Sequence, residues 1–176
     1  WLTWGGSAGL RFAERSGAPI ADYPQQGSFW TTAHFEQALD YDALAEAPDD
    51  ARDHWFWREP VRADKPDVPS SALFPGDLLF PDLTQEYEAR LRVMLHGFTD
   101  LGHHTVLKLN NRTLIDDRIW GGKRQGQVAL LVDAPIPSDS LRDGRNRVLL
   151  QVFADQEKFD WIYFNWFAID YRRLYT

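Results

Sequence analysis

The sequence predicts a mainly β protein, built as an antiparallel β-sandwich, on three observations. From Phe74 onward, short segments of alternating polarity are separated by turn sequences, a pattern typical of sheets with one buried face. Hydrophobic residues make up 44% and aromatic residues 14% of the 176 residues, which is enough for a substantial core. Helical spacing of apolar residues is confined to one weak stretch. We therefore predict a sandwich over residues 73–176.

Residues 1–72 are predicted to form an irregular, aromatic-rich extension that packs on the sandwich or completes a neighbouring domain. Residues 34–47 have weak helical spacing, and the acidic pair at positions 49 and 50 ends it. Residues 58–72 contain three prolines and are expected to be an extended linker. Short strands are expected at residues 1–12, 29–33 and 53–57.

The elements of the predicted sandwich follow from alternation and from turn residues. Residues 85–97 place apolar side chains on one face and charged side chains on the other, as a half-buried strand does. Asn110 and Asn111 separate two strand-like segments, and asparagine tolerates the positive φ that a two-residue hairpin loop needs. Gly144 is expected to turn the chain before another strand. The strands are predicted at residues 78–80, 85–97, 105–109, 113–117, 127–132, 145–153 and 161–171.

The last predicted strand is apolar on both faces. Strict alternation assigns Trp161, Tyr163, Phe167 and Ile169 to one face and Ile162, Phe164, Trp166 and Ala168 to the other. Such a strand needs cover beyond the facing sheet. The extension is expected to supply part of that cover through Phe29, Trp30, Trp55 and Trp57.

Charge and cysteine content exclude several functions. The net charge is −7, so nucleic acid and anionic membrane surfaces are not expected as partners. No apolar run approaches the roughly 20 residues that cross a bilayer. The chain has no cysteine, which excludes disulfides, thiolate metal sites and a cysteine nucleophile within these residues. No catalytic or phosphate-binding motif is present, so neither enzymatic activity nor a cofactor is expected.

Four segments carry a resemblance to a known family. They are residues 104–114, the Trp120-Gly121-Gly122 sequence, residues 141–150 and residues 160–171. Together they resemble the jelly-roll modules of galactose-binding-like type, and more narrowly the β-rich region beside the catalytic domain of gingipain-like cysteine peptidases of the C25 type. The resemblance implies a non-catalytic module of a larger secreted bacterial protein, with adjacent domains as partners and a location outside the cell or on its surface.

Aromatic side chains are the main binding candidates. Trp55, Trp57, Trp120 and Trp161 are the residues that would form a sugar-stacking platform, with Trp120 expected to be the most exposed. We favour the alternative that they pack in the core or between domains. The function hypotheses are therefore an accessory module, a carbohydrate-binding module that uses surface aromatics, and, third, a fragment of a glycoside hydrolase.

Two groups of polar residues are candidate metal sites. Asp100, His103 and His104 offer a carboxylate and two imidazoles within one loop, although their spacing matches no named motif. A polar loop between strands is the favoured interpretation. A structural calcium ion would draw on Asp82, Asp116, Asp117 and Asp133, which are otherwise expected to be solvated charges at strand ends.

Overall fold

The computed structural model describes most of the chain from residue 26 onward. The described residues are 16–17, 26–43, 54–66, 68–84, 86–100, 102–122, 128–155 and 158–175. The strand predicted within residues 1–12 lies outside them.

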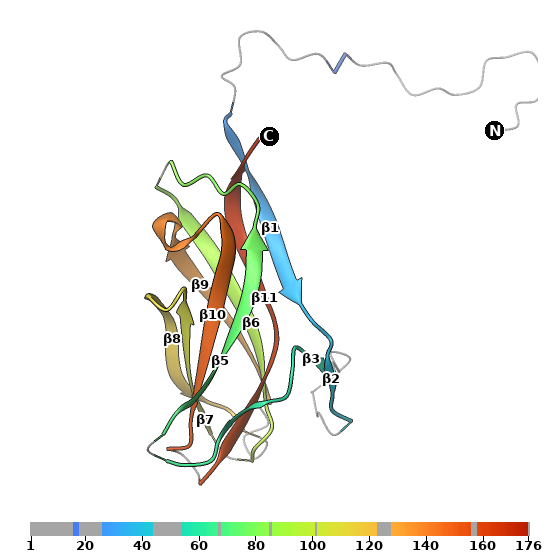
Figure 1. The fold of residues 1–176 in the computed structure, drawn as a ribbon, viewed down its shortest axis with the longest axis vertical. Coiled ribbons are helices and arrows are strands. Elements are labelled where there is room, and N and C mark those ends of the chain that lie inside the picture. Colours follow the sequence, from blue (N-terminus) through green and yellow to red (C-terminus); the bar gives the residue numbers. More distant parts are fainter. Residues whose placement is uncertain are drawn as a thin grey trace, which may run out of the picture.

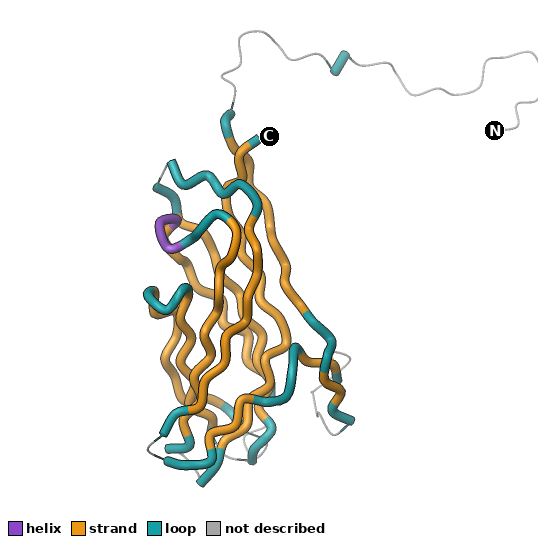
Figure 2. Tube along the Cα trace, viewed as in Figure 1, coloured by secondary structure: helices purple, strands orange, loops and turns teal. Residues whose placement is uncertain are grey.

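Two antiparallel sheets face each other (Figures 1 and 2). The first sheet has the order β1-β11-β6-β9, with β4 also paired to β11, and the second has the order β5-β10-β7-β8. From β4 to β11, successive strands pass back and forth between the sheets except for the β7–β8 hairpin, a connection pattern typical of a jelly roll. The predicted mainly β, antiparallel sandwich is confirmed. The first sheet comprises β1 (Ser28–Glu36), β4 (Val61–Ala63), β6 (Glu88–Gly97), β9 (Ala129–Pro137) and β11 (Asp160–Leu174). The second comprises β5 (Ser70–Leu78), β7 (His103–Leu109), β8 (Thr113–Trp120) and β10 (Gly144–Phe153).

Strands β1 and β4 divide one edge of the first sheet between them. Ser28 to Glu36 of β1 pair with Leu174 to Trp166, and Val61 to Ala63 of β4 pair with Ile162 to Asp160. Both run antiparallel to β11, so they are two pieces of one edge strand. Between them the chain leaves the sheet and forms a small hairpin from β2 (Asp40–Tyr41) and β3 (Trp55–Phe56), which projects beyond the end of β1 in Figure 1.

The core lies between the two sheets and is rich in aromatic rings. Phe74 of β5 stacks on Phe164 of β11 with ring centroids 3.7 Å apart. Trp57, which follows β3, is 5% exposed and stacks on Phe167 at 5.8 Å. Its backbone NH donates to the carbonyl of Phe164, at the gap between β1 and β4. The extension therefore contributes an indole to the core itself.

The face assignment predicted for the last strand is correct only up to Phe164. The register of β11 against β6 shifts between Phe164 and Trp166, which marks a β-bulge at Asn165. A bulge inserts one residue and reverses the alternation that follows it. Phe167 and Ile169 consequently join the buried core, while Trp166 moves to the outer face.

Two element predictions in residues 1–72 are wrong. Residues 34–36 belong to β1 and residues 40–41 to β2, so the described part of the predicted 34–47 helix, residues 34–43, contains strands and no helix. The predicted linker 58–72 contains β4 and the start of β5, because pairing with β11 and β10 supplies hydrogen bonds that propensity does not reveal. The strand predicted at 78–80 ends at Leu78, and Phe80 has a positive φ of 50°.

In the described part of the chain, no helix has the length and apolar character to cross a membrane.

Candidate functional site

An aromatic cluster lies on the outer face of the first sheet, where β11 begins. Trp161 stacks on Phe98 with centroids 5.7 Å apart and contacts Phe159 at 5.9 Å. Phe159 is 46% exposed, and Trp161 and Phe98 are partly exposed. Phe159 immediately precedes β11, and its ring contact with Trp161 places the two aromatic side chains on the same side of the sheet. We name Phe98, Phe159, Trp161 and the flanking Arg62 the Trp161 surface.

The indole of Trp161 is held by polar neighbours. The guanidinium of Arg62 lies 4.6 Å from the ring centroid, a cation–π distance. The indole NH donates to a carboxylate oxygen of Asp64 at 3.4 Å. Because Arg62 and Phe98 both contact this ring, they fix the orientation of the indole and cover part of its surface.

The β2–β3 hairpin continues this aromatic area. Phe56 is fully buried and stacks on Tyr163 at 4.2 Å, so it anchors the hairpin to the outer face of β11. Burial, together with the nearby negative charge of Asp42, raises the pKa of Tyr163 far above its usual value. On the outer side of the hairpin, Tyr41 and Trp55 remain 55% and 49% exposed with centroids 5.0 Å apart.

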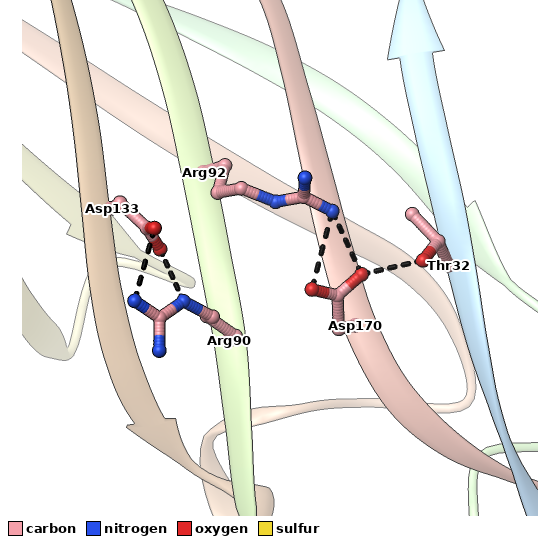
Figure 3. Close-up of polar contacts among 5 residues, drawn as sticks. All are labelled: Thr32, Arg90, Arg92, Asp133 and Asp170. Atoms are coloured by element: carbon pink, nitrogen blue, oxygen red, sulfur yellow. Dashed lines mark hydrogen bonds and ion pairs between the residues drawn. The ribbon is translucent and has the colours of Figure 1, made fainter.

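The rest of this outer face carries ion pairs together with further apolar side chains, since Trp30 on β1 and Leu131 on β9 are 57% and 48% exposed. Arg90 of β6 makes a two-point ion pair with Asp133 of β9, with Nη2 3.0 Å from Oδ2 (Figure 3). Arg92 of β6 donates to Asp170 of β11 at 2.9 Å, and the hydroxyl of Thr32 donates to the same carboxylate. Arg90 has its pKa raised by Asp133, and Asp133 has its pKa lowered by Arg90.

The four tryptophans considered as a sugar-stacking platform do not form one, and two of them pack in the core, the arrangement favoured from the sequence. Trp120 is only 6% exposed, its indole NH donates to Thr105 at 3.0 Å, and its ring lies 4.6 Å from that of His103. The expectation that Trp120 is exposed is therefore wrong, because the ring fills the end of the core instead of the adjacent loop. Trp57 is also in the core, which leaves Trp55 and Trp161 as the accessible members of the set.

The residues of the predicted Asp100–His103–His104 metal site point in different directions. His103 is fully buried and contacts Asp160 through Nδ1 at 2.7 Å. His104, the next residue along β7, faces the other side of the sheet and contacts Asp155 and Asp117 at 2.6 and 3.0 Å. Asp100 is exposed. Successive strand residues face opposite sides, so the two imidazoles cannot share one ion.

The four aspartates considered for calcium have separate partners. Asp82 is buried and accepts a hydrogen bond from the hydroxyl of Thr84, which lowers its pKa. Asp116 pairs with Arg118, Asp117 with His104, and Asp133 with Arg90. Within the described residues, no group of three or more His, Asp or Glu side chains is arranged to hold a metal ion.

An open pocket of about 580 Å³ lies between the start of β6 and the short 3₁₀ turn η2 (Ser138–Ser140). Three carboxylates line it, from Glu86, Glu88 and Asp139, together with Tyr87. All three acidic residues are exposed to solvent. The general acid of a glycoside hydrolase relies on an enclosed apolar setting, which this pocket lacks, so the hydrolase hypothesis gains no support from it.

Sequence reasoning did not identify Phe98, Phe159 and Tyr41. Phe159 lies just before β11 and reaches the cluster through its ring contact with Trp161. Phe98 and Tyr41 gave no local signal, since they reach this area only through the pairing of β6 with β11 and through the hairpin.

Comparisons with known proteins connect the chain to others through its fold. No protein-family model matches the sequence. No curated protein matches it either. Among solved structures, dimeric latent PorU from Porphyromonas gingivalis is similar with a TM-score of 0.55 and 12% identity over 85% of this chain. The family 36 carbohydrate-binding module of a multidomain xylanase from the hindgut metagenome of Trinervitermes trinervoides has a TM-score of 0.42 and 10% sequence identity. The match covers 80% of this chain and 96% of that module. A family 35 carbohydrate-binding module from Clostridium thermocellum has a TM-score of 0.40 and 7% sequence identity. The match covers 81% of this chain and 90% of that module.

The similarity to PorU concerns a small part of that protein. This chain spans 13% of the PorU chain. An identity of 12% at a TM-score of 0.55 indicates a common fold. The chain is thus a jelly-roll β-sandwich of the kind that also occurs as one segment of PorU.

Proposed function

We propose that this chain is a non-catalytic interaction module of a larger secreted bacterial protein, which docks on an adjacent domain of the same polypeptide through the Trp161 surface. The observation that carries the proposal is the aromatic cluster on the outer face of the first sheet, in which the rings of Phe98 and Phe159 both contact Trp161. Contiguous exposed aromatic area on a soluble domain marks interaction sites. Trp and Arg are also the side chains that most often dominate binding energy at protein interfaces.

The chemistry around Trp161 favours a protein partner over stacking with a sugar. A sugar ring stacks on a free indole face, whereas Arg62 and Phe98 already contact this indole. The ring edges of Trp161 and Phe98 and the guanidinium of Arg62 remain available for binding. These groups suit contacts with the side chains and backbone carbonyls of a protein surface.

A gingipain-like cysteine peptidase is the parent that we propose. The resemblance of residues 104–114 and 141–150 to the region beside such catalytic domains motivates this part, and the similarity to a short segment of the long PorU chain agrees with a module inside a larger protein. Because this chain has no cysteine, the nucleophile would come from another domain. A secreted or surface location follows from the same resemblance.

The test is a titration of this chain against its neighbouring domains. The flanking domains of the native polypeptide are produced separately and titrated calorimetrically with the 176-residue chain. We expect binding, and we expect Trp161→Ala and Phe159→Ser each to weaken it about tenfold or more, as interface anchors do. Leu114→Ser is the matched control, because Leu114 is 57% exposed on β8 of the other sheet.

Two results would overturn this proposal. One is the absence of binding to every flanking domain. The other is wild-type affinity of the Trp161→Ala and Phe159→Ser variants, with circular dichroism confirming that both are folded. Equal weakening by Leu114→Ser would point to general apolar adhesion and would also contradict it.

Carbohydrate binding is a second candidate, favoured by a different observation. Tyr41 and Trp55 are both about half exposed on the β2–β3 hairpin, and His54 lies 5.9 Å from Tyr41 with its own Nδ1 bonded to the carbonyl of Asp42. Such rings can stack on a sugar while the neighbouring polar atoms contact hydroxyls. A glycan array followed by titration with Trp55→Ala distinguishes this role: loss of glycan binding in that variant, with Trp161→Ala unaffected, supports it, and no glycan binding removes it.

A further inference from the structure

A second pocket, of about 360 Å³, opens at the end of the sandwich opposite the Trp161 surface. Strand β7 begins at His103, beside the start of β11, and ends at Leu109, so the β7–β8 turn lies at the far end. The pocket is enclosed by this turn and by the segment from η2 to Arg142. Its polar lining consists of Asn110, Arg112, Thr113, Asp139, Ser140 and Arg142.

The walls of this pocket are fixed by hydrogen bonds. Asn110 and Asn111 both have positive φ, of 53° and 61°, and form the tight turn. The side-chain amide of Asn110 donates to the carbonyl of Ser140 at 2.8 Å and to Asn146 Oδ1 at 3.0 Å. Asn146 Oδ1 also accepts from the backbone NH of Arg142 at 3.0 Å. The backbones that carry Arg112 and Arg142 are therefore held to each other before any ligand arrives.

The two arginines have no counter-ion among the described residues. Arg90, Arg118 and Arg145 pair with aspartates, whereas no described side chain makes an ion pair or hydrogen bond with the guanidinium of Arg112 or Arg142. Both residues are exposed. Two unpaired guanidiniums on a rigid frame, in a chain of net charge −7, form a local positive site.

The hydroxyls complete the donor set. Thr113 donates to Ser140 with oxygens 2.8 Å apart, which leaves the hydroxyl hydrogen of Ser140 free to point toward a ligand. Asp139 is the one carboxylate in the lining, and it also borders the acidic pocket beside Tyr87. The negative charge of Asp139 repels an anion, and the two positive guanidiniums of Arg112 and Arg142 attract it.

We propose that this pocket binds an oxyanionic group, a carboxylate, sulfate or phosphate carried by a small polar molecule. Guanidinium groups donate paired hydrogen bonds that match the oxygens of these anions. The volume of about 360 Å³ exceeds that of a bare ion and falls at the lower end of the range of small-molecule sites. This site is independent of the Trp161 surface, so its ligand is distinct from the protein partner proposed above.

The experiment is an NMR titration of the 15N-labelled chain with sodium sulfate, sodium phosphate and sodium acetate, each at constant ionic strength set with potassium chloride. We expect saturable shifts of the Arg112 and Arg142 Nε–H signals and of the Thr113 and Ser140 amides. Arg112→Gln and Arg142→Gln should each weaken binding about tenfold, the effect of losing one charge-assisted hydrogen bond. The comparison of sulfate, phosphate and acetate identifies whether a tetrahedral or a planar anion is preferred.

Two further variants separate a specific site from general attraction. Asp139→Asn should tighten binding, since it removes the opposing charge, and a folding defect cannot produce that result. Arg58→Gln removes one exposed positive charge outside the pocket lining, next to Trp57, and should leave binding unchanged. NMR shifts that do not saturate with any of the three anions would overturn the proposal. A loss of affinity in Arg58→Gln equal to that in Arg112→Gln and Arg142→Gln would also overturn it.

Discussion

His103 Nδ1 and Asp160 Oδ1 lie 2.7 Å apart, with their side chains 0% and 3% exposed, so a histidine of the second sheet is joined to a carboxylate of the first inside the protein. The hydroxyl of Thr99 donates to the same oxygen at 2.7 Å. Trp120 covers the imidazole at 4.6 Å. This contact fastens the two sheets at the end where the Trp161 surface lies, in addition to the apolar core.

Asp160→Ala is expected to destabilise the fold by about 3–5 kcal/mol, because it leaves buried donors on His103 and Thr99 without an acceptor. The measurement is urea-induced unfolding followed by tryptophan fluorescence. Asp64→Ala is the control, since Asp64 is exposed and accepts a hydrogen bond from the indole NH of Trp161, the residue after Asp160. A loss below 1 kcal/mol in Asp160→Ala would contradict a structural role for the pair.

Gly97→Ala is expected to lower the free energy of unfolding by about 1–3 kcal/mol through overpacking. A Cβ at this position would lie 2.0 Å from Nε2 of His103, so the imidazole or the backbone must move. A double-mutant cycle with His103→Ala tests the cause. Since the smaller side chain relieves the clash, the effect of Gly97→Ala should largely disappear in the His103→Ala background, and strict additivity would rule out the contact as the reason.

Asn146→Ala is expected to cost about 2–4 kcal/mol, because the fully buried amide bridges one turn to another. Asn146 Nδ2 donates to the carbonyls of Arg142 and Gly144, at 2.8 and 3.0 Å, and Oδ1 accepts from Asn110. Asn111→Gly is the matched control: the exposed Asn111 has a positive φ that glycine adopts freely, so its stability should change by less than about 0.5 kcal/mol. Equal effects of the two changes would contradict this role of Asn146.

The stability of the protein is expected to fall as the pH rises through the titration of His104. Burial alone would lower the pKa of His104, but the hydrogen bonds and charges of Asp117 and Asp155 outweigh it and raise the pKa above 6.5. A raised folded-state pKa means that the stabilisation is complete below about pH 6.5 and is lost as the pH passes the folded-state value.

This pH effect should amount to about 0.5–1 kcal/mol, because both carboxylates are substantially exposed. Unfolding curves at pH 5.5 and 8.5 measure it, with an NMR titration of the imidazole giving the pKa directly. His104→Gln should remove this contribution, and Asp155→Asn should lower the midpoint of the NMR titration. A His104 pKa at or below 6.5 would refute the prediction.

Much of the fold was predictable because its strands follow local rules. The alternation over residues 85–97, the double asparagine turn and Gly144, with its φ of 78°, all specify structure within a few residues. The bulge at Asn165 was missed although Asn165 is the one polar residue in the apolar run 161–169, because a polar residue alone does not reveal that the pairing of β11 with β6 requires an inserted residue. The helical spacing in residues 34–47 misled for a similar reason: β1 is held by its pairing with the distant β11, which outweighs local propensity.

The candidate sites were less predictable than the fold. Trp161 could be named from its residue type, but its partners Phe98 and Arg62 come from β-strand pairings across long stretches of sequence. Trp120 was misplaced because the adjacent glycines suggested an exposed loop, whereas the indole turns inward to bond with Thr105. Arg112 and Arg142 lie in two turns that meet only when Asn110 and Asn146 bond to each other.

The divided edge of the first sheet gives the protein a natural insertion point. Glu36 and Val61 pair with Trp166 and Ile162, positions on β11 that are roughly 13 Å apart along an extended strand. The part of the joining segment that precedes Phe56 can therefore change in length or sequence without altering the register of any sandwich strand, whereas Phe56 and Trp57 must stay because their rings are buried. Replacement of residues 39–55 by a short glycine-serine linker should leave a folded domain, and peptides of other sequences could be displayed at the same place.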